Sequence, residues 1–134
     1  MSRLLERVDY RRADSPEERE AIFRLRYDAY LREGAIKPSF GRRYTDAFDD
    51  KPNAWIFGIY LDGQLASSIR LSVTTPACKE LPGLNVFSDI LTPEIEAGRV
   101  IIDPTRFVAD HVIARAYPVL PYITVRLGWA AGEY

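Results

Sequence analysis

The chain has few of the residues that disulfides and zinc sites require. It holds one cysteine, Cys78, and one histidine, His111, among 134 residues. A single cysteine excludes an internal disulfide framework and fits a reducing compartment, and one histidine with one cysteine cannot form a Cys/His zinc site. No apolar run is long enough to cross a bilayer, and the first residues lack the apolar core of a signal peptide. We therefore expect a cytoplasmic protein with no metal and no membrane span.

The chain also has no large excess of either charge. It carries 18 Lys and Arg residues against 19 Asp and Glu residues, for a net charge of −1. Nothing in that balance favours nucleic acid or an anionic membrane as a partner. An apolar content of 47% and a charged content of 28% are ordinary for a globular chain. The length fits one domain, covering residues 1–134, with a core of its own.

A β-hairpin over residues 54–75 is the strongest local pattern. Two runs rich in β-branched and aromatic residues flank Asp62-Gly63, the dipeptide that type I′ turns favour. Both faces of this hairpin are largely apolar, so we expect helices to cover both. A two-residue loop pairs Trp55 with Arg70 and places Arg70 on a covered face. There it needs an anionic partner, unless it lies at the strand end and reaches water.

The remaining elements follow from periodicity and caps. Ser15, Pro16 and Glu18 predict a capped helix start, and Gly34 predicts its end. Arg26 falls near the middle of the apolar stripe of that helix, which favours a polar cluster over a side chain that merely runs to the helix edge. The expected elements are a short edge strand at 6–13, this helix at 15–33, a short helix within 84–96, a strand at 99–103 ended by Pro104 and a helix at 118–131.

Charged residues in two further segments are candidates for a site. The irregular stretch 35–53 carries Asp46, Asp49 and Asp50, and long irregular stretches are often functional, although a solvated turn is the simpler interpretation. A bulge at Gly98 would bring Glu96 and Arg99 to one side of the expected strand; otherwise they form a surface ion pair. Arginines clamp carboxylates and a free carboxylate can serve as a base, so this set suits a carboxylated or zwitterionic ligand.

Four short motifs occur in an order and spacing typical of one family. They are Leu25-Arg26-Tyr27 with Tyr30, Asp46-Ala-Phe-Asp49, Arg70 near the end of the second hairpin strand, and Glu96-Ala-Gly-Arg99. Over residues 8–104 the chain thus resembles the acyl-homoserine-lactone (autoinducer) synthases and the related N-acyl amino acid synthases. The resemblance implies an α+β (α/β sandwich) domain of GNAT-like N-acyltransferase fold. Its central sheet would be mostly antiparallel with helices on both faces. It also implies that the last strands, which complete the acyl pocket, are missing from these 134 residues.

The resemblance further implies transfer of a fatty acyl chain from acyl carrier protein to the amine of an amino acid-like acceptor. Such enzymes need no cofactor, although acyl-CoA is an alternative donor, and some serve quorum sensing. A homodimer is compatible with the resemblance. Carried over residue by residue, Glu96 would be the base, acting directly or through water, and Arg99 its catalytic partner. The residues implied in substrate binding are Arg26, Tyr30, Asp46, Asp49 and Arg70.

Departures from the family pattern separate the alternatives. Ile36 stands where autoinducer synthases carry a tryptophan, which favours an N-acyl amino acid over a product made from S-adenosylmethionine. Gly98 stands where the family has a hydroxyl residue before the last arginine. No Gln/Arg-x-x-Gly-x-Gly/Ala loop follows Asp103, which argues against a GNAT acetyltransferase that uses acetyl-CoA. A non-catalytic ligand-binding relative is the third alternative.

Overall fold

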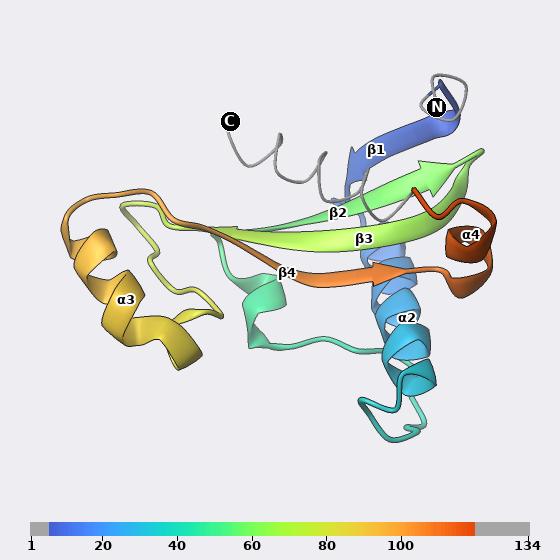
Figure 1. The fold of residues 1–134 in the computed structure, drawn as a ribbon, viewed down its shortest axis with the longest axis horizontal. Coiled ribbons are helices and arrows are strands. Elements are labelled where there is room, and N and C mark those ends of the chain that lie inside the picture. The colour runs from blue at the N-terminus through green and yellow to red at the C-terminus, as the bar shows by residue number, and fades with distance from the viewer. Residues whose placement is uncertain (1–5, 120–134) are drawn as a thin grey trace.

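One antiparallel sheet of four strands forms the centre of the computed structural model, which describes residues 6–119 (Figure 1). Its strands are β1 (Val8–Arg12), β2 (Ala54–Leu61), β3 (Gln64–Val73) and β4 (Ile102–Ala109), in the order β1-β2-β3-β4. The helices are α2 (Pro16–Arg32), the 3-10 helix η1 (Ala47–Asp50), α3 (Leu84–Glu96) and α4 (His111–Ala116). This architecture confirms the predicted α+β class, its antiparallel sheet and the short strand near the N-terminus.

The hairpin of β2 and β3 turns at Asp62 and Gly63, as predicted. Their φ angles are 51° and 81°, and a type I′ turn requires positive φ at both central positions. The predicted pairing of Trp55 with Arg70 is wrong, because a bulge shifts the register and places Ile56 opposite Arg70. One extra residue in a strand moves every later side chain to the other face. Arg70 therefore shares the face of Ile56.

Helix α2 covers that face of the sheet, together with η1 (Figure 1). Ser15 caps α2, and Glu18 completes the capping box, as the sequence predicts. Ile22 and Phe23 are buried and pack with Ile56. We call this side of the sheet the α2 face, and it is the side on which the candidate site lies.

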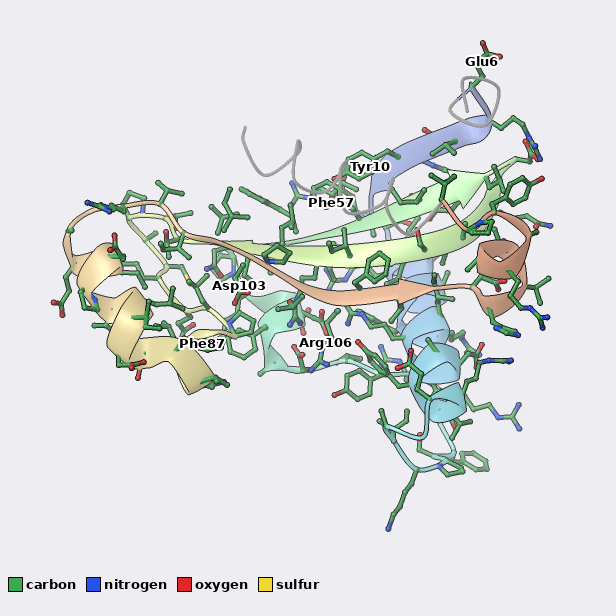
Figure 2. All side chains as sticks on the ribbon, viewed as in Figure 1. Glu6, Tyr10, Phe57, Phe87, Asp103 and Arg106 are labelled. Carbon is green, nitrogen blue, oxygen red and sulfur yellow. The ribbon has the colours of Figure 1, made fainter. Side chains whose placement is uncertain are left out.

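The other side of the sheet, here called the opposite face, is apolar. Tyr10 stacks on Phe57 with ring centroids 4.8 Å apart, and Figure 2 shows both on the side of the sheet away from Asp103 and Arg106. Helix α4 packs Ile113 and Tyr117 against the cluster around Ile59 at the hairpin end. The helix expected at 118–131 falls almost entirely outside the described residues.

Strand β4 differs from its prediction in position. The expected strand at 99–103 would end at Pro104, whereas β4 begins at Ile102 and runs through Pro104 to Ala109. Proline is tolerated here because β4 pairs with β3 alone among the described strands, so one side needs no N–H donor. Gly98 has a φ of 80° and follows the end of α3, where helices favour glycine, rather than forming a bulge.

No helix among residues 6–119 combines the length and the apolar character that a bilayer crossing requires.

Candidate active site

Asp49 joins two buried arginines from different elements. Arg26 of α2 donates from Nη1 to Asp49 Oδ2 at 2.9 Å, and Arg70 of β3 donates from Nη1 to Asp49 Oδ1 at 3.0 Å. The three residues are 0%, 1% and 2% exposed for Arg26, Arg70 and Asp49. Buried charges require such pairing. The prediction that both arginines cluster with an acid from among Asp46, Asp49 and Glu96 is confirmed for Asp49.

Asp46 extends the network towards solvent. Its Oδ1 accepts a hydrogen bond from Arg70 Nη1 at 2.5 Å, and its Oδ2 accepts one from Arg106 Nε of β4 at 2.9 Å. Arg70 is also held by its strand neighbour, because its Nε donates to Thr105 Oγ1 at 3.1 Å. We call Arg26, Asp46, Asp49, Arg70 and Arg106 the arginine–aspartate cluster.

The spacing of the two aspartates explains how an irregular loop positions both. Asp46 caps η1 by accepting a hydrogen bond from the Phe48 N–H at 2.9 Å, while its own N–H donates to Asp49 Oδ2 at 2.8 Å. This reciprocal arrangement is a capping box, which needs its two side chains three positions apart. Residues 46–49 thus form a capped turn in which the Asp46 and Asp49 carboxylates face the arginines, rather than a solvated turn.

A bulge in β4 brings Arg106 to the cluster. Arg70 pairs with Thr105 and Ser68 with Val108, so the register shifts between these pairs. Arg106 has a φ of 54°, a left-handed conformation that costs a non-glycine residue about 1–3 kcal/mol. In a regular strand neighbouring side chains point to opposite faces. The bulge allows Thr105 and Arg106 both to contact the residues of the α2 face.

Two tyrosines flank the Arg106 guanidinium. Its Cζ lies 4.9 Å from the ring centroid of Tyr44 and 5.8 Å from that of Tyr30. The two rings meet edge to face, with centroids 5.0 Å apart and planes at 79°. Cations are attracted to aromatic faces at such distances. Tyr30, to which the family resemblance assigns a role in substrate binding, therefore lies beside the cluster.

The cluster carries a net positive charge. It places three guanidinium groups against two carboxylates, which leaves one positive charge uncompensated within it. The side chains of Arg26 and Arg70 are 0% and 1% exposed, whereas that of Arg106 is 30% exposed. The excess positive charge thus reaches solvent at Arg106.

Both cluster aspartates are ionised at neutral pH. Partial burial by itself would raise the pKa of Asp46, but hydrogen bonds from Arg70 and Arg106 outweigh it and lower that pKa from 3.8 to about 2. Burial likewise opposes ionisation of Asp49, and its hydrogen bond with Arg26 holds its pKa below the ordinary value. Carboxylates held this firmly ionised are poor proton acceptors near pH 7.

We expect the contribution of Asp46 to stability to disappear in acid. Its pKa is lower in the folded chain than in the unfolded one, so its contribution is complete above about pH 4 and is lost as the pH falls towards 2. A shift of this size corresponds to at most about 2 kcal/mol at neutral pH, and solvent screening of the partly exposed pair with Arg106 reduces it further. Chemical denaturation of wild type and Asp46→Asn should show a difference that shrinks over this range. A difference that stays constant from pH 7 to pH 2 would contradict the ion-pair assignment.

Glu96 and Arg99 do not lie where the sequence predicts. Glu96 is the exposed last residue of α3, and Arg99 pairs with Glu94 at 2.8 Å with its own side chain 70% exposed. Among residues 6–119, neither side chain has a hydrogen bond or ion pair with the cluster. The predicted placement is wrong because the segment is a helix end, and their catalytic role stays a prediction without a supporting contact. Asp50 also lies outside the cluster, exposed and paired with Arg19.

Strand β4 carries three residues of the α2 face that were not predicted as site residues, Asp103, Thr105 and Arg106. Asp103-Pro-Thr-Arg106 repeats the spacing of Glu96-Ala-Gly-Arg99, with an acid three positions before an arginine. It also supplies Thr105, a hydroxyl residue immediately before the arginine, which the first motif lacks at Gly98. Asp103 pairs in register with Ser72, so it shares the face of Arg70. The hydroxyl residue before the arginine, Thr105, is the sequence feature that favours the second motif over the first.

Asp103 has one oxygen engaged. Its Oδ2 accepts a hydrogen bond from the Gly83 N–H at 2.7 Å, at the start of α3. Its Oδ1 has no hydrogen-bond partner in the described part of the chain. Figure 2 shows Asp103 and Arg106 on the same side of β4. Unlike Asp46 and Asp49, this carboxylate forms no ion pair with an arginine among the described residues.

Comparison with known proteins defines the class and then the family. The chain shares its fold with the solved structure of FeeM, an N-acyl amino acid synthase from uncultured soil microbes, with a TM-score of 0.69 and 24% identity. The match covers 93% of this chain and 65% of that one, so the chain spans about two thirds of the FeeM chain. The class is therefore a GNAT-like α+β domain, as predicted, with a buried arginine–aspartate cluster.

The family model described as N-acyl amino acid synthase FeeM matches residues 21–133, which is most of the chain. The protein belongs to this FeeM family. A search of curated proteins found no match. The predicted membership in the autoinducer-synthase-like and N-acyl amino acid synthase group is confirmed on the N-acyl amino acid synthase side.

Proposed function

We propose that the protein is an N-acyltransferase that transfers a fatty acyl chain from acyl carrier protein to the amine of an amino acid. The observation that carries this proposal is the net positive arginine–aspartate cluster within the FeeM family fold. An acceptor with a carboxylate is attracted to the uncompensated guanidinium, and an arginine fork can hold that carboxylate in one orientation. Correct orientation is a large part of what such a site contributes to the reaction.

The reaction requires one proton acceptor. The acceptor amine is protonated at neutral pH and must lose a proton before its nitrogen can attack the thioester carbonyl. The new C–N bond forms, the C–S bond breaks, and the departing sulfur takes a proton to become the carrier thiol. A second proton leaves the amine nitrogen as it becomes an amide. A carboxylate that accepts these protons, directly or through water, serves as the general base.

We assign the base to Asp103 in place of Glu96. Asp46 and Asp49 are committed to arginines, which lower their pKa values. Asp103 lies two positions before Thr105, about 7 Å along the strand, and shares the face of Arg70. Its Oδ1 is free of partners within residues 6–119, so it can accept a proton without disrupting the cluster.

The segment after β4 supports a carrier-protein donor. Coenzyme A phosphates are commonly held by a glycine-rich loop at a helix N-terminus. In this chain Asp110 occupies the start of α4, where its Oδ1 accepts a hydrogen bond from the Ile113 N–H at 3.0 Å. A carboxylate at this position repels phosphate, and no glycine occurs between Gly98 and Gly128. The loop missing after Asp103 is thus missing after the true strand end at Ala109 as well.

Donor and acceptor can be tested in one set of reactions. We expect purified protein to form an N-acyl amino acid from a long-chain acyl carrier protein thioester and a mixture of amino acids, detected by mass spectrometry. Transfer from acetyl-CoA should be at least about 10-fold slower, because the segment after β4 lacks the glycine-rich loop that commonly binds coenzyme A phosphates. S-adenosylmethionine replaces the amino acids in a parallel reaction. Tight coenzyme A binding with acetylation of a small amine would instead identify an acetyltransferase, and no product with any donor would indicate a non-catalytic binding domain.

A further inference from the structure

We propose that Arg106 binds the α-carboxylate of the acceptor and thereby restricts the protein to free amino acids. The class of ligand, an amino acid, comes from the proposed function. The assignment to Arg106 rests on three separate structural observations. The first observation is the charge distribution, since the single uncompensated positive charge of the cluster reaches solvent at Arg106 alone.

The second observation is the way Arg106 is held. Its Nε donates to Asp46 Oδ2 at 2.9 Å, and its Nη2 lies 2.8 Å from the same oxygen. One edge of the guanidinium is thereby fixed. Nη1 and the second hydrogen of Nη2 form another edge, which has the geometry to donate two parallel hydrogen bonds to a carboxylate. The Tyr30 side chain also forms a hydrogen bond with this guanidinium, so a bound carboxylate would lie beside the Tyr30 hydroxyl. Tyr44 and Tyr30 flank the group and restrict its rotation.

The third observation is the backbone. A non-glycine residue with a φ of 54° is strained, and such strain persists where the surrounding structure holds the residue in place. Without the β4 bulge, Arg106 would point away from Thr105 and from the cluster. The same bulge keeps Arg106 on the side of β4 where Asp103 projects (Figure 2). An amino acid whose carboxylate is bound by Arg106 thus presents its amine on the side of the proposed base.

An arginine that only anchored Asp46 would give a different result from one that binds the ligand. Binding of N-dodecanoyl amino acids and of the corresponding amides, measured by calorimetry, separates the two roles. We expect wild type to bind the acids about 100-fold more tightly than the amides. In Arg106→Gln the ratio should fall to about 1–3, and in Arg106→Lys, which keeps the charge but loses the fork, to about 10.

Arg24→Gln is the matched control, because Arg24 lies on the outer side of α2 with its side chain 61% exposed. It should keep the wild-type ratio. Thermal unfolding identifies any variant that fails to fold. If Arg106→Gln does not fold, the acid-to-amide binding ratio of Arg106→Lys is compared with that of wild type. Equal binding of acid and amide by wild type, no binding of either, or an unchanged ratio in both Arg106 variants would overturn the inference. Acyl transfer is measured separately, so carboxylate-dependent binding without transfer would refute only the proposed function.

Discussion

Replacing Asp49 with asparagine is expected to lower the free energy of unfolding by about 3–5 kcal/mol. The change removes the carboxylate that binds both Arg26 and Arg70, at 2.9 Å and 3.0 Å. Both guanidinium groups are almost fully buried, and removing one partner of a buried ion pair leaves an uncompensated charge in the interior. The energetic cost is largest at Arg26, because its Nε and Nη2 already lack hydrogen-bond partners within the described residues.

Asp50→Asn provides the control for this stability measurement. Asp50 is adjacent in sequence, and its side chain is 88% exposed while it pairs with Arg19 at 2.9 Å. An exposed pair of this kind contributes at most about 1 kcal/mol. Urea denaturation of both variants at pH 7 tests the difference between a buried and an exposed carboxylate. Equal losses for the two variants would show that Asp49 does not hold the arginines together.

The second large effect is expected on activity. Asp103→Asn should reduce acyl transfer by about 10²–10⁴-fold with little change in stability, because the amide keeps the size of the side chain but cannot accept a proton. Glu96→Gln makes the same chemical change in the other acid-x-x-arginine motif. It should leave activity within about twofold of wild type, since Glu96 is exposed at the end of α3. Initial rates with acyl carrier protein thioester compare the two variants directly.

The opposite outcome would restore Glu96 as the expected general base. If Glu96→Gln abolished transfer while Asp103→Asn did not, the base would be Glu96, and α3 would have to move towards the cluster during the reaction. The pH dependence of kcat/KM adds a second readout, because loss of a general base removes the acidic limb of the profile.

The local part of the fold could be predicted from the sequence because short-range chemistry decides it. Asp62-Gly63 allows the two positive φ angles that the turn needs, and Ser15 with Glu18 satisfies the free N–H groups of a helix start. The pairing of buried charges was predictable for a similar reason. Arg26 on an apolar stripe and Arg70 on a covered strand both required anions, and the aspartates of the 46–49 segment supplied them.

The predictions of the sheet were wrong where one extra residue shifts the register between two strands. The extra residue in β3 moved Arg70 to the other face, and the bulge at Arg106 sits in a strand that was expected to stop at Pro104. A bulge has no reliable sequence pattern when the residue with positive φ is not glycine. The glycine at position 98 suggested a bulge there, but its positive φ serves the end of α3. The bulge expected at Gly98 favoured Glu96-Ala-Gly-Arg99 as the site motif, whereas Asp103-Pro-Thr-Arg106 is the motif on the α2 face.

The most direct test of the central claim is mass spectrometry of lipid extracts from a host that overexpresses the protein. We expect new N-acyl amino acids in cells with wild-type protein, and their absence both in cells with Asp103→Asn and in cells with an empty vector. The free carboxylate of the acceptor should be intact in every new species, as the net positive cluster requires. Extracts identical to the empty-vector control, from cells with abundant folded protein, would contradict the account.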